Sequence, residues 1–320
     1  MKILVIQLRQ LGDVLMTTPS LSALRFGDPA GKIHFLIQEQ CAGVVRGNPC
    51  VTRVLPYNGQ GFVALARELR RESYDAVIDF QGFPKTALLA RLTGARLRIG
   101  FARRFRTPFY THAIDRTEGP LYSAMDKARL LAPLSLRVED FSLHLPVTSA
   151  HAAEAEALGV RFGLASAGRV AAFSPVSRRE YKRWPLERYA TVCDALHARY
   201  GFRFLPLFGP GEGPAVEEVI ACSHSTGAFL YPYAPPSFNA LLPLLKACAF
   251  YFGNDNGIRH VAIAAGLPTA TVFGTPDPRA WTPPADSRHR WLWGKDAMDR
   301  ISTDALLDEI EKLLHENKIV

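Results

Sequence analysis

The chain opens with MKILVIQLRQLGDVL (residues 1–15), in which an apolar run meets a polar turn and then becomes apolar again. We expect MKILVI (1–6) to form a buried central strand and the following stretch to turn and continue as a helix to about Arg25. Alternation of strands and helices along a chain is typical of a parallel sheet. Further strands of this half are predicted at KIHFLI (32–37) and YDAVIDF (74–80).

The alternation restarts in the second half of the chain with RVAAFSP (169–175) and a helix from Pro185 to Gly201. We therefore predict an α/β protein of two Rossmann-like, doubly wound parallel-sheet domains, residues 1–165 and 166–320, facing a cleft. Ligands are expected at the C-terminal ends of strands, which selects four loops. Further strands are predicted at FRFLPLFG (202–209), AFYFGND (249–255) and PTATVFG (268–274), and a final helix at TDALLDEIEKLLHENK (303–318).

Composition excludes several classes of protein. The apolar opening is interrupted by Gln7 and Arg9, unlike a signal peptide, and the apolar region 228–252 is broken by prolines and Lys246, unlike a membrane span. We expect a cytoplasmic protein. The five cysteines include no C-x-x-C pair and the nine histidines no H-E-x-x-H, so neither a disulfide framework nor a metal site is predicted.

The positive charge is concentrated in the first half. Residues 1–150 carry 20 Lys and Arg against 12 Asp and Glu, whereas residues 151–320 carry 18 of each. The densest group is RLRIGFARRFR (96–106), which is either a solvated loop or a surface for an anionic partner or membrane. A pI near 9.4 would also fit nucleic-acid binding, but no recognition motif accompanies the charge, and we expect no nucleic-acid partner.

Two of the selected loops have clear alternatives. Asp13 lies at the predicted start of a helix, where it is either a helix N-cap or a general base that takes a proton from a hydroxyl. SPVSRREYKRWP (174–185) gathers Ser177, Arg178 and Lys182 before a helix. This loop is either solvated charge or a cradle for a diphosphate.

The other two loops also follow predicted strands. In FGNDNGIRHVAIAAG (252–266), backbone N–H groups around Asn256 and Gly257 could bind phosphate oxygens, with His260 one turn further along. The alternative is an ordinary capped helix with a satisfied histidine. In GPGEGP (209–214), Glu212 could accept hydrogen bonds from a ribose or simply belong to a turn.

Assembled, these stretches resemble glycosyltransferase family 9, the bacterial ADP-heptose:lipopolysaccharide heptosyltransferases. The forms GDVLMTTP and FGTPDPRAWTP are most similar to the branch that adds a third, side-branch heptose. The resemblance runs the length of the chain and is carried by LGDVLMTTPSLSALR (11–25), GNPCVTRV (47–54), YDAVIDFQGFPKTALLARLTGARLRIGF (74–101), KRWPLERYA (182–190) and GNDNGIRHVAIAAGLPTATVFGTPDPRAWTPP (253–284).

The resemblance implies a GT-B fold and inverting transfer of heptose, without metal or cofactor, from ADP-heptose to a hydroxyl of the lipopolysaccharide inner core. It implies that the first domain holds the acceptor, the second holds the donor, and the enzyme works at the inner face of the inner membrane. Asp13 matches the family's catalytic base and Lys182 its phosphate-contacting lysine. The other matching donor residues are Ser177, Arg178, Asp255, Gly257 and His260; Glu212 and Asn256 complete the predicted donor site, and Arg103, Arg104 and Arg106 the acceptor site.

The chain departs from the family pattern at two positions. Asn256 stands where the D-[TS]-G motif has a hydroxyl residue, and Val176 follows Pro175 where relatives often have Pro-Gly. Alternative functions are a family 9 transferase with another donor or glycan acceptor, and a nucleotide-sugar or polyanion-binding protein without turnover.

Overall fold

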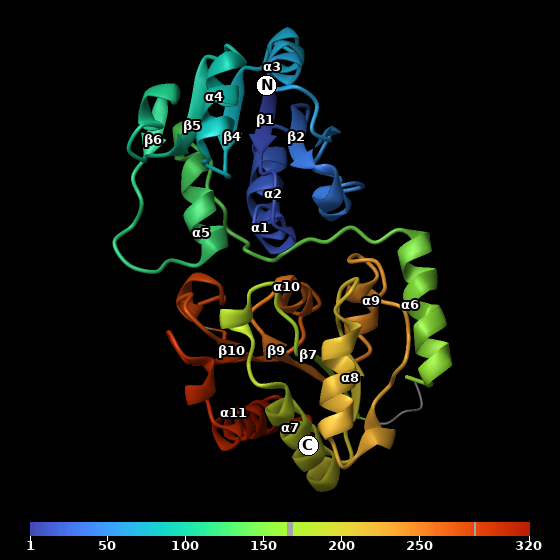
Figure 1. Cartoon of the computed structure of the whole chain (residues 1–320). Coiled ribbons are helices and arrows are strands. Elements are labelled where there is room, and N and C mark those ends of the chain that lie inside the picture. Colours follow the sequence, from blue (N-terminus) through green and yellow to red (C-terminus); the bar gives the residue numbers. More distant parts are fainter. Residues whose placement is uncertain (165–168, 285) are drawn as a thin grey trace. The chain divides into compact units, whose positions relative to one another are not determined.

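The computed structural model describes residues 1–164, 169–284 and 286–320. Contacts divide the chain into two compact units, Met1–Pro146 and Val147–Val320 (Figure 1). The boundary predicted near residue 165 lies outside the described residues. Helix α6 (Ser149–Phe162), which we placed before that boundary, packs against α9 (Leu241–Leu245) and so belongs to the second unit.

The first unit contains a six-stranded sheet in the order β3-β2-β1-β4-β5-β6, and every pairing is parallel (Figure 1). Central strand β1 is buried on both faces, which explains its continuous apolar sequence. The strands are β1 (Lys2–Ile6), β2 (Lys32–Gln38), β3 (Arg53–Tyr57), β4 (Ala76–Asp79), β5 (Leu97–Phe101) and β6 (His112–Ile114).

The helix predicted to run to about Arg25 is interrupted. It forms α1 (Leu11–Leu15) and α2 (Thr18–Gly27), with Pro19 in the first turn of α2. Proline lacks an N–H donor and is tolerated at a helix start but not in a helix interior, so Pro19 accounts for the break. The remaining helices of this unit are α3 (Phe62–Arg71), α4 (Pro84–Leu92) and α5 (Ser123–Ala128).

The second unit contains a five-stranded parallel sheet in the order β11-β10-β9-β7-β8. Its strands are β7 (Val170–Ser174), β8 (Arg203–Pro206), β9 (Phe250–Asn254), β10 (Thr269–Phe273) and β11 (His289–Trp293). Its other helices are α7 (Leu186–Tyr200), α8 (Gly213–Cys222), α10 (Gly257–Ala264) and α11 (Thr303–Glu316). The final helix α11 packs on α7, β10 and β11 of the same unit.

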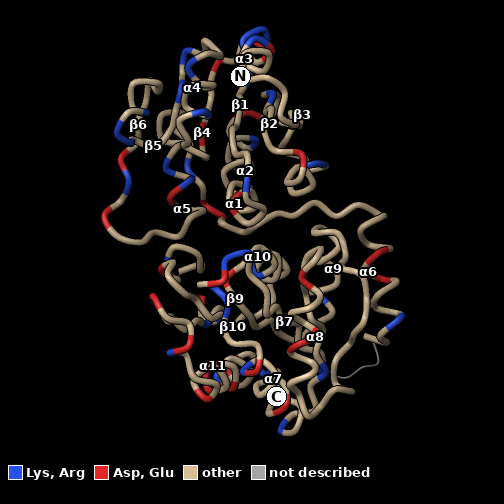
Figure 2. Tube along the Cα trace, viewed as in Figure 1, with Lys and Arg blue, Asp and Glu red and all other residues tan. Residues whose placement is uncertain are grey.

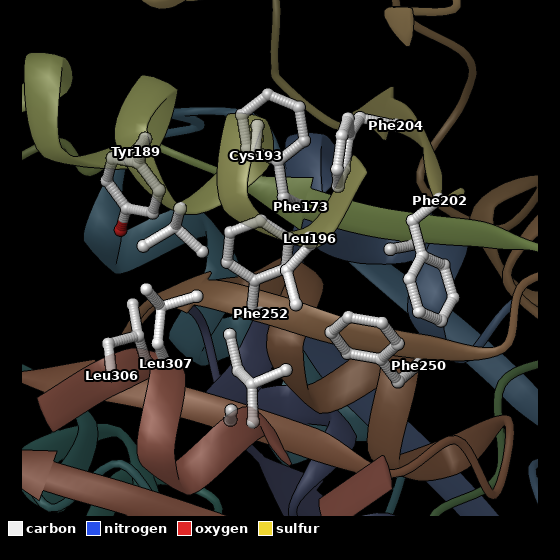
Figure 3. Packing of buried hydrophobic residues seen from close by; sticks show 14 of the residues in the cluster. Phe173, Tyr189, Cys193, Leu196, Phe202, Phe204, Phe250, Phe252, Leu306 and Leu307 are labelled. Atoms are coloured by element: carbon white, nitrogen blue, oxygen red, sulfur yellow. The ribbon is translucent and has the colours of Figure 1, made fainter. Parts of the chain in front are cut away.

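Aromatic side chains from neighbouring strands form the core of the second unit. Phe173 of β7 stacks on Phe252 of β9 with ring centroids 5.5 Å apart, and Phe204 of β8 meets Phe173 edge to face (Figure 3). Leu306 and Leu307 of α11 belong to the same buried cluster. The cluster fixes the relative positions of the central strands, and therefore of the loops that follow them.

Each sheet has one point where the strand order reverses. In the first unit it lies between β1 and β4, and in the second between β7 and β9. Ligands of doubly wound sheets bind outside the carboxyl ends of the strands at this switch point. The loops after β1, β4, β7 and β9 are therefore the candidate functional loops. No helix of the described residues is both long and apolar enough to span a membrane.

Candidate functional site

Asp13 is not the N-cap of its helix. Gln10 occupies the N-cap of α1 and Asp13 lies in the first turn, directly after β1. Within the described residues no backbone N–H donates to its carboxylate, and the side chain is 31% exposed. Its polar contact is with Lys127 of α5, whose Nζ lies 3.9 Å from Oδ1. The structure therefore disfavours the capping role and leaves the carboxylate accessible.

A buried network holds the turn that carries Asp13. Lys127 donates to Gln7 Oε1 (2.8 Å), and Gln7 Nε2 donates to the Arg9 carbonyl (2.6 Å) and to Gln81 Oε1 (3.1 Å). The same Gln81 oxygen accepts from the backbone N–H groups of Leu8 and Arg9. Burial lowers the pKa of Lys127, and the nearby carboxylate of Asp13 partly opposes that shift.

Asp79 ends β4 on the other side of the switch point and is fully buried. Its carboxylate accepts from the Gly82 N–H (2.9 Å) and from Tyr110 Oη (2.8 Å). The Tyr110 ring lies so close to Gly100 that any side chain at position 100 would overlap it. Burial raises the pKa of Asp79 to about 6, which the hydrogen bonds only partly offset.

The three arginines predicted to bind the acceptor differ in their surroundings. Arg103 and Arg104 are exposed in the connection between β5 and β6, and the Arg104 guanidinium stacks on exposed Phe105. Arg106 is half-buried and donates to the Gly82 carbonyl, so it supports the loop after β4. Figure 2 shows the basic residues of this unit in blue, including those between β5 and β6.

In the second unit, two residues predicted in separate loops form one ion pair. Lys182 Nζ lies 2.8 Å from Asp255 Oδ2, and their side chains are 20% and 6% exposed. Lys182 ends the 3₁₀ turn Glu180–Lys182 after β7, and Asp255 directly follows β9. The pair therefore occupies the switch point of the second sheet.

Asn256 caps α10 and ties it to the loop after β7. Its Oδ1 accepts from the N–H groups of Ile258 and Arg259, and its Nδ2 donates to Ser174 Oγ (2.9 Å) and the Val176 carbonyl (2.9 Å). Asn256 therefore already accepts from two of the backbone N–H groups that we expected to bind a phosphate, those of Ile258 and Arg259. Gly257, the first residue of α10, stays a predicted contact.

His260 is buried and neutral. Burial and, secondarily, the charge of Arg259 lower its pKa to about 3. Its Nδ1 has no hydrogen-bond partner in the described part of the chain, and its ring lies 6.0 Å from that of Trp281. A buried polar atom without a hydrogen-bond partner costs about 1–3 kcal/mol. A ligand that pairs with Nδ1 would explain why this atom is kept here.

Three further predicted donor residues lie in loops after strands of this sheet. Ser177 is buried, and its carbonyl accepts from Arg183 Nε (2.8 Å). Arg178 is exposed on the same loop. Glu212 Oε2 accepts from the Gly209 N–H (2.7 Å), which closes the turn before α8. The binding roles of these three residues stay predictions.

Sequence reasoning missed Arg259, which is completely buried in α10. It donates to Thr271 Oγ1 (2.8 Å), the Trp281 carbonyl (2.9 Å) and Thr282 Oγ1 (2.8 Å), and so holds the loop after β10. It also missed Asp79, although an acidic residue at the end of an apolar strand was a readable signal. Among the described residues no three of His, Cys, Asp and Glu form a group that could hold a metal ion.

The model of glycosyltransferase family 9 (heptosyltransferase) matches residues 62–305. The chain belongs to this family. It is therefore a glycosyltransferase, and its two parallel-sheet units form the GT-B architecture. The matched region contains the Lys182–Asp255 pair and begins after Asp13.

Similar proteins cover nearly the whole chain of this family 9 member. Lipopolysaccharide heptosyltransferase 3 of Escherichia coli K12 is 25% identical, with 97% of each chain covered. The crystal structure of the family 9 glycosyltransferase from Veillonella parvula DSM 2008 matches with a TM-score of 0.83 and 24% identity, covering 98% of this chain and 97% of the other. The structure of E. coli heptosyltransferase WaaC with ADP-2-deoxy-2-fluoro heptose matches with a TM-score of 0.73 and 22% identity, covering 98% of this chain and 99% of the other.

Proposed function

We propose that this family 9 enzyme transfers heptose from ADP-heptose to a hydroxyl of the lipopolysaccharide inner core, with inversion and without a metal ion. The observation that carries the proposal is the Lys182–Asp255 pair at the switch point of the second sheet, together with buried His260, whose Nδ1 has no hydrogen-bond partner among the described residues. The matched relative named lipopolysaccharide heptosyltransferase 3 supports the acceptor class. WaaC, whose structure contains an ADP-heptose analogue, supports the donor.

In this proposal the second unit binds the donor. Lys182 faces the diphosphate and offsets the charge that builds on departing ADP. Ser177 and Arg178 contribute to the same phosphate region, and Gly257 offers a backbone N–H at the start of α10. Glu212 accepts from the ribose with the carboxylate oxygen that does not bind Gly209. His260 gains from the donor the partner that its Nδ1 lacks.

Asp13 acts as the general base on the acceptor. It takes the proton of the acceptor hydroxyl as that oxygen bonds to the anomeric carbon, and the bond from that carbon to the ADP oxygen breaks on the opposite face. Attack opposite the leaving group inverts the anomeric configuration. The accessible carboxylate of Asp13, which is not used as a helix cap, supports this role.

The first unit binds the acceptor and the anionic surface of the inner membrane. The inner core and lipid A carry carboxylates and phosphates, and the positive excess of the chain lies in residues 1–150. Exposed Arg103 and Arg104 are the proposed contacts. Forked guanidinium groups suit planar carboxylate and phosphate partners. We place the enzyme in the cytoplasm at the inner face of this membrane.

The deciding experiment measures donor binding and turnover in EDTA. Calorimetric titration compares ADP-heptose with UDP-glucose and GDP-mannose, and we expect selective binding of ADP-heptose. Asp13→Ala should keep donor binding and lose most turnover, whereas Lys182→Ala should lose both. Product NMR should show the inverted anomer.

Other results would support other functions. Preference for another nucleotide sugar would replace the donor but keep the transferase chemistry. Donor binding without turnover on any glycan would favour a binding protein. Equal rates for wild type and Asp13→Ala would remove the base assignment.

A further inference from the structure

Helix α5 places a buried ammonium beside the turn that carries Asp13. Lys127 is 6% exposed, and its Nζ lies 2.8 Å from Gln7 Oε1 and 3.9 Å from Asp13 Oδ1. Buried charges are costly unless hydrogen-bonded and paired. Gln7 is neutral, so in the described part of the chain Asp13 supplies the only carboxylate within ion-pair distance of Lys127.

The other charged groups around Lys127 are engaged elsewhere. Asp126, its neighbour on α5, pairs with Arg116 and with Arg129 (3.0 Å). Asp79 at the end of β4 is bonded to Gly82 and Tyr110. Arg116 opposes the positive charge of Lys127, while the carboxylates of Asp13, Asp126 and Asp79 favour it. The partner left for the ammonium is therefore Asp13.

The network also restricts the orientation of Asp13. Gln7, the residue that accepts from Lys127, donates to the Arg9 carbonyl within the turn between β1 and α1. Lys127 is thus linked through the Gln7 side chain to the turn that carries Asp13, and its Nζ lies within ion-pair distance of one oxygen of the Asp13 carboxylate. The second oxygen, Oδ2, receives no hydrogen bond from the described residues.

We propose that Lys127 is a positioning residue that holds Asp13 on the side of its Oδ1 and leaves Oδ2 to face the acceptor hydroxyl. The proposal rests on the proposed function, in which Asp13 is the general base. A catalytic group must be held in a productive geometry, so loss of the pair should lower kcat while donor affinity is kept. Lys127 acts through Asp13 and does not touch the donor.

The test uses Lys127→Met, which removes the charge and keeps much of the side-chain volume. Its matched control is Lys2→Met, because Lys2 lies at the opposite end of β1 and pairs with Glu72. For Lys127→Met we expect kcat to fall about tenfold, because the carboxylate of Asp13 is less well oriented. Affinity for ADP-heptose should stay within twofold of wild type, and Lys127→Arg should restore much of kcat.

A role confined to folding predicts a different result. In that case Lys127→Met would lower the melting temperature and the amount of folded enzyme, but kcat per folded enzyme would stay at the wild-type value, which would overturn the proposal. Lys127→Gln, which removes the charge and keeps an N–H donor, takes over the test should Lys127→Met not fold. The Lys2→Met control should leave kcat unchanged.

A double-mutant cycle separates this proposal from the proposed function. If Lys127 acts through Asp13, adding Lys127→Met to Asp13→Asn should cause little further loss of rate. Full additivity would refute the inference. A wild-type rate in Asp13→Asn would refute the base assignment itself. An inactive Asp13→Asn together with a wild-type kcat in Lys127→Met would refute only the role of Lys127.

Discussion

Replacing Asp79 by asparagine should remove a pH dependence from the stability of the first unit. Asp79 is fully buried, and burial raises its pKa to about 6 from 3.8. The native state therefore keeps the proton to higher pH than the unfolded chain does. The stability that the protonated form contributes is fully present below about pH 3.8 and is lost as the pH rises through about 6.

The magnitude follows from the size of the pKa shift. A shift of about two pH units at about 1.4 kcal/mol per unit corresponds to about 3 kcal/mol. Asparagine has nearly the same shape as aspartate, so the substitution leaves no cavity. Its oxygen can still accept from the Gly82 N–H, and its amide can donate to the Tyr110 oxygen. The difference in unfolding free energy between Asp79→Asn and wild type should therefore rise by about 2 kcal/mol from pH 4 to pH 7.5 in favour of the variant, because part of the total is already lost at pH 4.

The chain contains an internal control for this measurement. All four tryptophans, Trp184, Trp281, Trp291 and Trp293, lie in the second unit, so their fluorescence reports the unfolding of that unit. Urea unfolding of the first unit is followed by hydrogen exchange of the β1 and β4 amides. Asp75→Asn, the same change at an exposed position before β4, should show no comparable trend. A free-energy difference for Asp79→Asn that is flat between pH 4 and pH 7.5 would refute the burial argument.

Two further predictions concern one glycine and the three arginines. Gly253→Ala should destabilise the second unit by about 1–3 kcal/mol, because the added Cβ would lie 2.5 Å from the Ser174 carbonyl oxygen. Urea unfolding followed by tryptophan fluorescence measures this loss. Unchanged stability would mean that β7 and β9 move apart easily to make room for the methyl group. The double substitution Arg103→Gln and Arg104→Gln should raise the KM for the acceptor and weaken the salt dependence of this KM, while the stability of the protein stays unchanged. Arg106→Gln should instead lower the melting temperature, because Arg106 donates to the Gly82 carbonyl. Loss of ADP binding in the Arg103/Arg104 variant would contradict the proposed division between the units.

Strands β1, β7 and β10 were predictable because burial on both faces of a sheet favours a continuous apolar sequence. MKILVI, RVAAFSP and PTATVFG are nearly continuous apolar runs, and the structure makes each of them a strand with neighbours on both sides. Strand β11 was missed because it pairs on one side only and carries His289 and Arg290. An edge strand does not need the apolar pattern that identifies a central one.

The site was predictable only where chain topology determines it. Lys182 and Asp255 are 73 residues apart, yet both follow strands at a switch point, and the rule for parallel sheets selects both loops. Lys127 follows no strand pattern, because α5 comes after a stretch with little regular structure. Its position beside Asp13 depends on tertiary packing. At Arg106 the structure adds a contact with the Gly82 carbonyl that the dense basic run does not indicate, and its role toward the acceptor stays a prediction.

The two departures from the family pattern meet in a single contact. The Val176 carbonyl accepts from Asn256 Nδ2 (2.9 Å), and the same amide caps α10 through its oxygen. A serine or threonine hydroxyl could cap the helix, but it has one donor, whereas the asparagine amide has two and also reaches Ser174. The departure at position 256 thus strengthens the link between the loops after β7 and β9. In the proposed complex, selection of the donor therefore depends on Lys182, Gly257 and His260 rather than on the side chain at position 256.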